Sequence, residues 1–223
     1  MKSGLWRALA VMLAVCGNAQ LADAALILPD RGTLDRLLRT EAVRENFERF
    51  PVDPFGAIDL DVDSLDATTV TNGQGPGLLV PGITIEDESG LQWNGRGYFG
   101  QPSRTISGGS TLHIDFHDPV GAFGLDLLVF AHLADIARVS VFAADDTTLI
   151  GTFQIPVFDP SFEMFFGIAD RGRIGRVSLT GTTWPWSPVV DDLTFGTRAV
   201  PEPGVAILFM VGGAMAWRRF RRR

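Results

Sequence analysis

Two groups of aromatic residues have the side-chain types and the spacing that a carbohydrate-binding surface requires. Trp184 and Trp186 are separated only by Pro185, so their indole rings can form a stiff, flat platform for the face of a sugar ring. Trp93 and Tyr98 form a second aromatic segment, with an asparagine and an arginine between them. Large aromatic side chains also dominate protein cores, so the alternative is that these residues close the ends of the fold.

A strand with two histidines is a weaker candidate for metal chemistry. His113, Asp115 and His117 occupy alternate positions, so all three side chains share one face of the predicted strand. At ~3.3 Å per residue, the α-carbons of the two histidines lie about 13 Å apart. Zinc ligands must converge to ~2.0–2.1 Å from one ion. We therefore expect a solvated strand face here.

Catalytic motifs are not found in the sequence. It contains no Gly-x-Ser-x-Gly, no His-Glu-x-x-His and no phosphate-binding loop. The only cysteine, Cys16, lies in a predicted leader, so the mature chain would have no thiol and no disulfide. We predict a non-catalytic protein without a cofactor, and a hydrolase is the less favoured alternative.

The charge of the chain excludes one class of partner. Residues 25–200 contain 12 basic and 24 acidic residues, which gives a formal charge of −12. An acidic surface repels the phosphate backbone. We therefore expect no nucleic-acid binding.

The elements that must position the aromatic residues are strands. From residue 46 onward, short runs with alternating or continuous apolar residues are separated by turn residues such as Asn72-Gly73 and Gly108-Gly109. About ten strands without intervening helices predict an all-β fold, an antiparallel and jelly-roll-like β-sandwich over residues 46–197. The expected strands lie within 58–62, 83–85, 112–116, 120–130, 139–142, 149–153, 163–168, 174–180 and 193–195. A short helix within 30–42, capped by Thr33, is expected in a lead-in over residues 25–45.

The N-terminus has the three parts of a secretory leader. Lys2 and Arg7 supply positive charge, and residues 9–15 form a short apolar run. Ala22 and Ala24 supply the small residues that precede a signal-peptidase cut. The sequence therefore predicts a cleaved signal peptide over residues 1–24, in a helix too short to span a membrane.

The C-terminus has a separate pattern over residues 199–223. Pro201, Glu202 and Pro203 form an extended motif, an apolar run follows at 205–217, and five arginines are clustered in 218–223. As a single transmembrane helix, the thirteen apolar residues would rise about 20 Å, against a hydrocarbon core of ~30 Å. The arginines are expected on the cytoplasmic side.

This order of motif, apolar run and arginine cluster resembles the PEP-CTERM sorting tail, which is also named after ice-binding proteins. The resemblance implies export, recognition by an exosortase and cleavage near the motif. It also implies a transient inner-membrane anchor, followed by release or transfer to the cell surface or extracellular polysaccharide. A plain tail anchor is the alternative.

The body resembles those of many exported PEP-CTERM proteins and, through them, jelly-roll carbohydrate-binding modules. Asn46-Phe47-Glu48, residues 118–124, Phe166-Gly167-Ile168 and residues 191–196 carry this second resemblance. In such modules an acid near the first strand and one on the last share a structural calcium ion, and Glu48 with Asp191 or Asp192 matches those places. The alternative is that Glu48 faces solvent and that the two aspartates form a turn.

The sequence as a whole predicts an exported surface or matrix protein with a structural or adhesive role in the extracellular polysaccharide. A lectin-like carbohydrate-binding module is the alternative.

Overall fold

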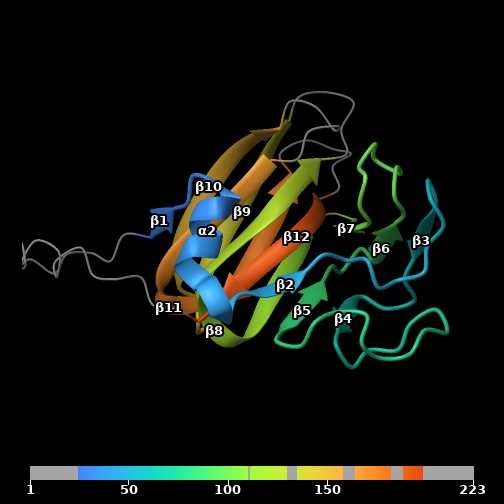
Figure 1. Ribbon diagram of the computed structural model, residues 1–223, viewed down its shortest axis with the longest axis horizontal. Coiled ribbons are helices and arrows are strands. Elements are labelled where there is room, and N and C mark those ends of the chain that lie inside the picture. Colours follow the sequence, from blue (N-terminus) through green and yellow to red (C-terminus); the bar gives the residue numbers. More distant parts are fainter. Residues whose placement is uncertain (1–24, 110, 130–134, 158–163, 182–187, 198–223) are drawn as a thin grey trace, which may run out of the picture.

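The computed structural model describes residues 25–109, 111–129, 135–157, 164–181 and 188–197, and every strand pair in it is antiparallel (Figure 1). The predicted signal peptide and the predicted sorting tail lie outside these residues. Within the described part of the chain, no helix is long and apolar enough to cross a membrane. The elements are β1 (Leu26–Ile27), α2 (Arg31–Leu38), a 3₁₀ turn (Arg39–Glu41), β2 (Val43–Glu45), β3 (Ala57–Asp59), β4 (Ser64–Asp66), β5 (Ile83–Glu86), β6 (Leu91–Asn94), β7 (Thr105–Gly108), β8 (Thr111–Val129), β9 (Asp135–Ala143), β10 (Leu149–Val157), β11 (Met164–Gly181) and β12 (Pro188–Gly196).

Two long strands, β8 and β11, pass from one layer of the protein to the other. The first half of β8 pairs with β5 and its second half pairs with β12. β11 pairs with β1 through its first half and with β9 through its second half, with shifts in register between Ala169 and Arg176. The pairing thus defines one layer of β10, β9, β11, β8, β5 and β4. The other layer contains β1, β11, β8, β12, β7, β6 and β3, with β2 beside β12. The predicted all-β antiparallel architecture is confirmed, and the pairing has the two layers of a β-sandwich.

The core lies between these two layers. Leu112 and Ile114 are buried in the first half of β8, and Phe123, Leu125 and Leu127 are buried in its second half, all in one apolar cluster. The alternation predicted at 112–116 is therefore confirmed. Residues on both sides of the bend in β8 belong to the same core, because the strand contributes to both layers.

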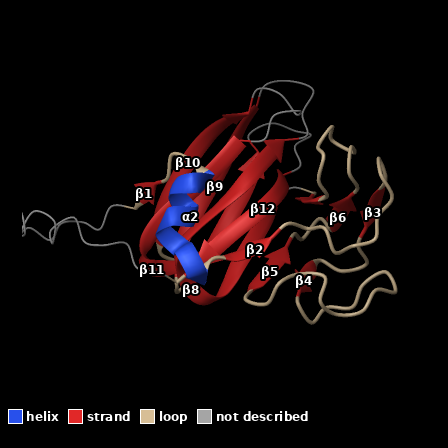
Figure 2. Cartoon of the chain, in the orientation of Figure 1, coloured by secondary structure: helices blue, strands red, loops and turns tan. Residues whose placement is uncertain are grey.

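A helix covers the outer face of the second layer, where α2 crosses in front of the strands (Figure 2). Leu34 and Leu38 are buried against Ala122 and Ala169. A Cβ atom at Gly124 would lie 2.7 Å from Leu34 Cδ2 and 2.7 Å from the ring of Phe165, so only glycine lets the helix and the ring pack here. The predicted lead-in of residues 25–45 is thus built into the body, with β1 and β2 in the sheet.

Several sequence-based expectations differ from the structure. The strand predicted at 58–62 ends at Asp59, and β1, β2 and β4 were not predicted. Runs 112–116 and 120–130 form one strand, as do 163–168 and 174–180, because β-strands bend between layers without ending. The helix is capped by Asp30, whose carboxylate accepts from Thr33 N at 2.7 Å, and not by Thr33. β6 and β7 were not predicted, because their residues alternate only over four positions each.

Candidate ligand-binding site

Two loops beside β3 and β6 are joined into one rigid unit. Phe55 N donates to Arg96 O at 2.7 Å, and Gly95 N donates to Gly56 O at 2.8 Å. A side chain at Gly95 would overlap the carbonyl oxygen of Asp53, so glycine is required for this close approach. The loops of residues 53–56 and 95–101 therefore hold each other in place.

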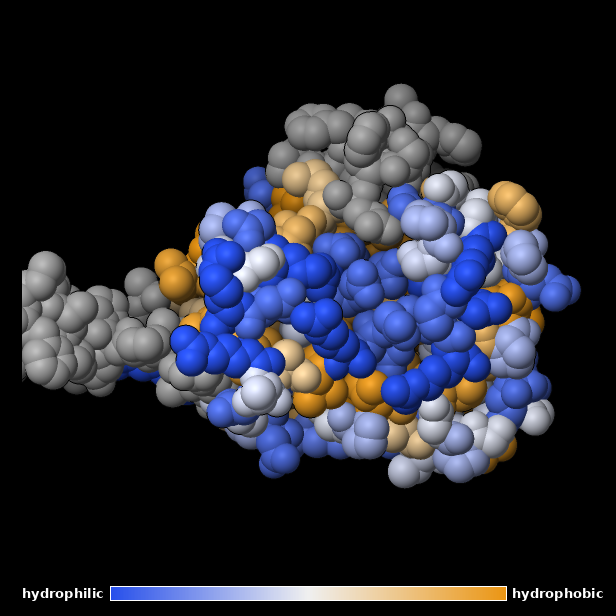
Figure 3. All heavy atoms as spheres, viewed as in Figure 1, coloured by the Kyte–Doolittle hydropathy of each residue, from blue (hydrophilic) through white to orange (hydrophobic). Residues whose placement is uncertain are grey.

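This unit displays three aromatic side chains, Phe55, Tyr98 and Phe99, which we call the aromatic patch. Phe55 is 76% exposed and Tyr98 is 42% exposed. Tyr98 and Phe99 meet edge to face, with ring centroids 4.8 Å apart. The Phe55 ring packs against Gly97, whose φ is +84°. A Cβ atom at position 97 would overlap the ring, so glycine makes room for it. The face of the molecule in Figure 3 is mostly hydrophilic, with hydrophobic residues in small groups. A group of exposed aromatic rings on such a polar surface is a candidate binding site.

Glu48 lies beside the patch in an arginine cluster. Its Oε2 accepts from Arg96 Nη2 at 2.8 Å and from Arg104 Nη1 at 3.0 Å, and its Oε1 accepts from Arg104 N at 3.1 Å. Burial raises the pKa of the Glu48 carboxyl, but the hydrogen bonds and charges of the two arginines outweigh this effect and hold the pKa below its ordinary value. The pairing also fixes the guanidinium of Arg96, half-exposed next to Tyr98.

Asp191 and Asp192 belong to a different network. Asp191 is buried, accepts from Ser103 Oγ, and accepts from Asp192 N at 2.7 Å. Asp192 adopts a left-handed backbone conformation at φ 45°, at the register shift of β12. Nowhere in the described ranges do three Asp, Glu, His or Cys side chains gather in a way that would hold a metal ion. Glu48 thus has two arginine partners, and the calcium site with Asp191 or Asp192 stays a prediction.

Trp93 was predicted as a ligand-binding residue in a loop, and this prediction is wrong. It lies on β6, it is 0% exposed, and its Nε1 donates to Phe47 O at 2.9 Å. Its ring stacks on Phe50 at 5.1 Å between centroids. The alternative, a core role, holds for Trp93. Of its predicted segment, Arg96 and Tyr98 reach the surface, whereas Trp93 and Asn94 are buried.

The remaining predicted site residues lie outside the described residues. They are Trp184 and Trp186 of the predicted platform, Ala22 and Ala24 of the signal-peptidase site, and Pro201, Glu202 and Pro203 of the sorting motif.

The histidine strand has the polar face that was expected. His113 Nδ1 is 2.7 Å from Ser178 Oγ, Asp115 pairs with Arg176, and His117 Nε2 is 2.8 Å from Thr84 Oγ1. The three side chains thus bind three different neighbours, which explains their types without a shared ion.

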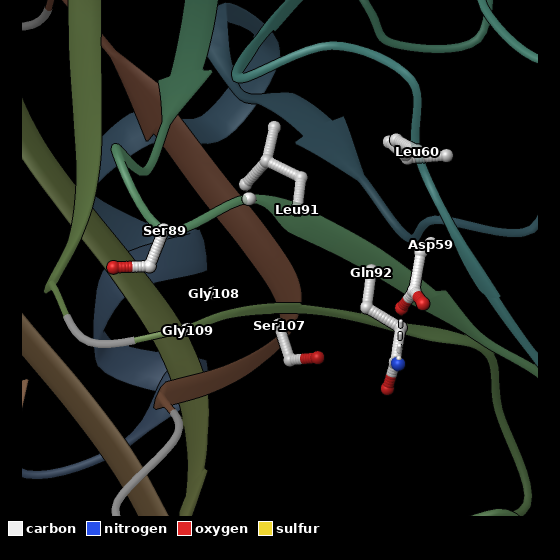
Figure 4. Close-up of a pocket in the computed structure, with 9 residues that line it drawn as sticks. Asp59, Leu60, Ser89, Leu91, Gln92, Ser107, Gly108 and Gly109 are labelled. Carbon is white, nitrogen blue, oxygen red and sulfur yellow. Dashed lines mark hydrogen bonds between the residues drawn. The ribbon is translucent and has the colours of Figure 1, made fainter.

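A pocket of about 380 Å³ opens beside β3, β6 and β7 (Figure 4). Asp59, Gln92 and Ser107 come from three neighbouring strands, and Gly108 and Gly109 form part of its wall. Sequence reasoning missed this pocket and also Phe55. The only local signal for Phe55 is its place between Pro54 and Gly56, which indicates a turn.

Comparisons with known proteins give only weak similarities. No protein-family model and no curated protein matches the chain. Among solved structures, the family 29 carbohydrate-binding module CBM29_1 from Piromyces equi has 7% identity and a TM-score of 0.38, over 71% of this chain and 92% of that one. The CBM22-1–GH10 modules of xylanase 10B from Clostridium thermocellum have 13% identity and a TM-score of 0.38, over 72% of this chain and 29% of that one. A family two carbohydrate esterase from Cellvibrio japonicus has 11% identity and a TM-score of 0.30, over 66% of this chain and 36% of that one. The chain thus spans about a third of the last two proteins, and similarities of this size do not establish a shared function.

Proposed function

We propose that this protein is an exported, non-catalytic β-sandwich that binds polysaccharide through the aromatic patch and acts as an adhesive component of the extracellular matrix. The observation that carries the proposal is the exposure of Phe55 and Tyr98 on a rigid pair of loops. Their positions are fixed by backbone hydrogen bonds, so little conformational entropy is lost when a ligand packs on the rings.

The chemistry of the patch fits a sugar chain. The C–H face of a sugar ring is apolar and packs on an aromatic ring, while its hydroxyl groups need polar partners at the edge. Arg96 supplies such a partner beside Tyr98, because its guanidinium is held by Glu48 and is still half-exposed. An aromatic surface with a few fixed polar groups is typical of a binding site.

Delivery to the matrix is proposed from the sequence of the two ends. A signal peptide would start export, and Pro201, Glu202 and Pro203 would be the recognition motif of an exosortase. We also propose that the strands of the body are connected in a jelly-roll-like order. The resemblance of the body to exported PEP-CTERM proteins supports this proposal and that of export.

Binding to the matrix polysaccharide of the native host tests the aromatic patch. We expect Phe55→Ala/Tyr98→Ala to weaken binding at least about tenfold, a loss of about 1.4 kcal/mol. The matched control is Val70→Ala/Leu149→Ala, which removes two exposed apolar side chains at other places on the surface. Equal binding by the wild type and the patch variant would remove the patch from the proposal. A parallel Trp184→Ala/Trp186→Ala variant tests the tryptophan platform.

Mass spectrometry of the mature protein from its own cells tests the sorting proposal. We expect an N-terminus that follows Ala24 and a C-terminus near Pro201–Pro203. A membrane-bound protein that still ends in Arg223 would contradict exosortase processing.

A further inference from the structure

The pocket beside β3, β6 and β7 contains hydrogen-bonding groups that the protein itself does not use. Gln92 Nε2 donates to Asp59 Oδ1 at 2.7 Å, the hydrogen bond drawn in Figure 4. The register places Asp59 opposite Gln92 and Gln92 opposite Ser107, so the three side chains form one row across the three strands. This row is the polar wall of the pocket.

Each member of the row has bonding capacity left over. Asp59 Oδ2 and Gln92 Oε1 are acceptors without a partner among the described residues, and Gln92 retains a second N–H. Ser107 Oγ accepts from Asn94 Nδ2 at 3.0 Å, so the hydroxyl proton of Ser107 remains to be donated. Asp59 thus offers an acceptor, Gln92 offers an acceptor and a donor, and Ser107 offers a donor, along a distance of two strand spacings, roughly 10 Å.

Next to Ser107 at the end of β7, part of the lining is backbone. Gly108 and Gly109 line the pocket next to Ser89 and Gly90. A side chain at Gly108 would overlap the carboxylate of Asp87, and one at Gly109 would lie 2.5 Å from Ser89 Cβ. The two glycines thus let the end of β7 pack closely on Asp87 and Ser89, and Leu60 and Leu91 supply the apolar part of the lining.

These features select a class of ligand. A group that both donates and accepts, such as a hydroxyl, matches the mixed row of Asp59, Gln92 and Ser107. The carboxylate of Asp59, in a body of formal charge −12 over residues 25–200, disfavours an anion. A volume of about 380 Å³ is at the lower end of the range for small-molecule sites, ~300–1,000 Å³.

We propose that this pocket binds a single neutral sugar residue, through hydrogen bonds from its hydroxyl groups to Asp59, Gln92 and Ser107. The choice of a sugar among polyhydroxy compounds rests on the proposed function, whereas the preference for a neutral, hydroxyl-rich ligand comes from the pocket. The aromatic patch and the pocket lie at opposite ends of the same three-stranded ladder, so they are separate sites.

Saturation-transfer NMR with the full chain tests this proposal. The probes are the methyl glycosides of glucose, mannose and galactose, N-acetylglucosamine, and glucuronate as the charged comparison. We expect at least one neutral probe to bind and glucuronate to bind at least fivefold more weakly. Asp59→Asn and Gln92→Ala should each weaken the neutral probe at least fivefold. Asp63→Asn, an exposed aspartate outside the pocket, should have no effect.

Three results would overturn the proposal. They are no binding by any neutral probe, equal binding by glucuronate, and unchanged binding by both pocket variants. Circular dichroism checks that each variant is folded, and Ser107→Ala replaces Gln92→Ala if that variant does not fold. Phe55→Ala/Tyr98→Ala should leave the binding of the small probe unchanged, so failure of the aromatic patch and failure of the pocket give different results.

Discussion

The indole Nε1 of Trp93 donates a hydrogen bond to the backbone carbonyl of Phe47, 2.9 Å away in the core. The two side chains also meet edge to face, with ring centroids 5.9 Å apart. Through this pair, β6 is tied to the segment that follows β2. The contact fixes the base from which the 95–101 loop, and with it Tyr98, projects.

Shortening Trp93 should therefore destabilise the fold. Trp93→Phe leaves the Phe47 carbonyl without its donor, which costs about 1–3 kcal/mol, and Trp93→Ala should cost about 3–5 kcal/mol through the cavity that it leaves. Urea unfolding monitored by circular dichroism measures both changes. A Trp93→Phe variant with wild-type stability and weakened glycan binding would instead support the original prediction for this residue.

The close packing of α2 on the sheet can be tested at Gly124. We expect Gly124→Ala to lower the free energy of unfolding by about 1–3 kcal/mol, because the new Cβ lies 2.7 Å from Leu34 Cδ2. The control is Gly75→Ala, where nothing lies within 4 Å of the new atom. That variant should stay within about 0.5 kcal/mol of the wild type.

A double variant locates the effect at the helix. In Gly124→Ala/Leu34→Ala the overlap with Leu34 is removed. The double variant should therefore lose less free energy of unfolding than the two single variants lose together. Additive losses would show that Gly124 acts through something other than the helix.

Glu45 is a buried carboxylate that binds two backbone amides. Its Oε1 accepts from Phe47 N at 2.7 Å and its Oε2 accepts from Val80 N at 2.7 Å. Glu45→Gln turns one of these oxygens into an amide donor that faces an N–H group, so we expect a loss of about 2–3 kcal/mol in chemical unfolding. Glu86→Gln, at a partly exposed position on β5, is the control and should change stability little. Equal stability of both variants would show that the two amides find other partners.

The arginine cluster at Glu48 should give the fold an acid-sensitive contribution. The pKa of Glu48 is lowered from 4.5 in the folded state, so the contribution is complete above pH 4.5 and is lost as the pH falls through the lowered pKa. Melting temperatures of the wild type and Glu48→Gln, measured from pH 2 to 7, should differ at neutral pH and converge in acid. Parallel curves would contradict this role.

The calcium prediction for Glu48 with Asp191 or Asp192 has its own measurement. Because both oxygens of Glu48 bind arginines, we expect the melting temperature to be the same with calcium chloride and with a chelator. An increase with calcium that Glu48→Gln abolishes would establish the metal site.

Local patterns allowed several parts of the fold to be predicted. Leu112, Ile114 and Phe116 are buried as their alternation indicated, because a strand places successive side chains on opposite faces whatever its neighbours are. The helix near Asp30 was found for the same reason, since its apolar spacing is local. Tyr98 is exposed, and its predicted contact with a glycan stays a prediction.

The sequence by itself determined that the chain forms antiparallel strands around an apolar core, because alternation and turn residues act over a few positions. Only the tertiary structure decided which aromatic residues are exposed. Trp93 and Phe55 are both large and apolar, but β6 has a neighbour on each side and faces Phe47 and Phe50, whereas Phe55 lies on a loop outside the sheet. The row of Asp59, Gln92 and Ser107 likewise exists only after β3 pairs in one register with β6 and β7, which follow it by more than thirty residues in the chain, and that register is set by contacts that no single segment encodes.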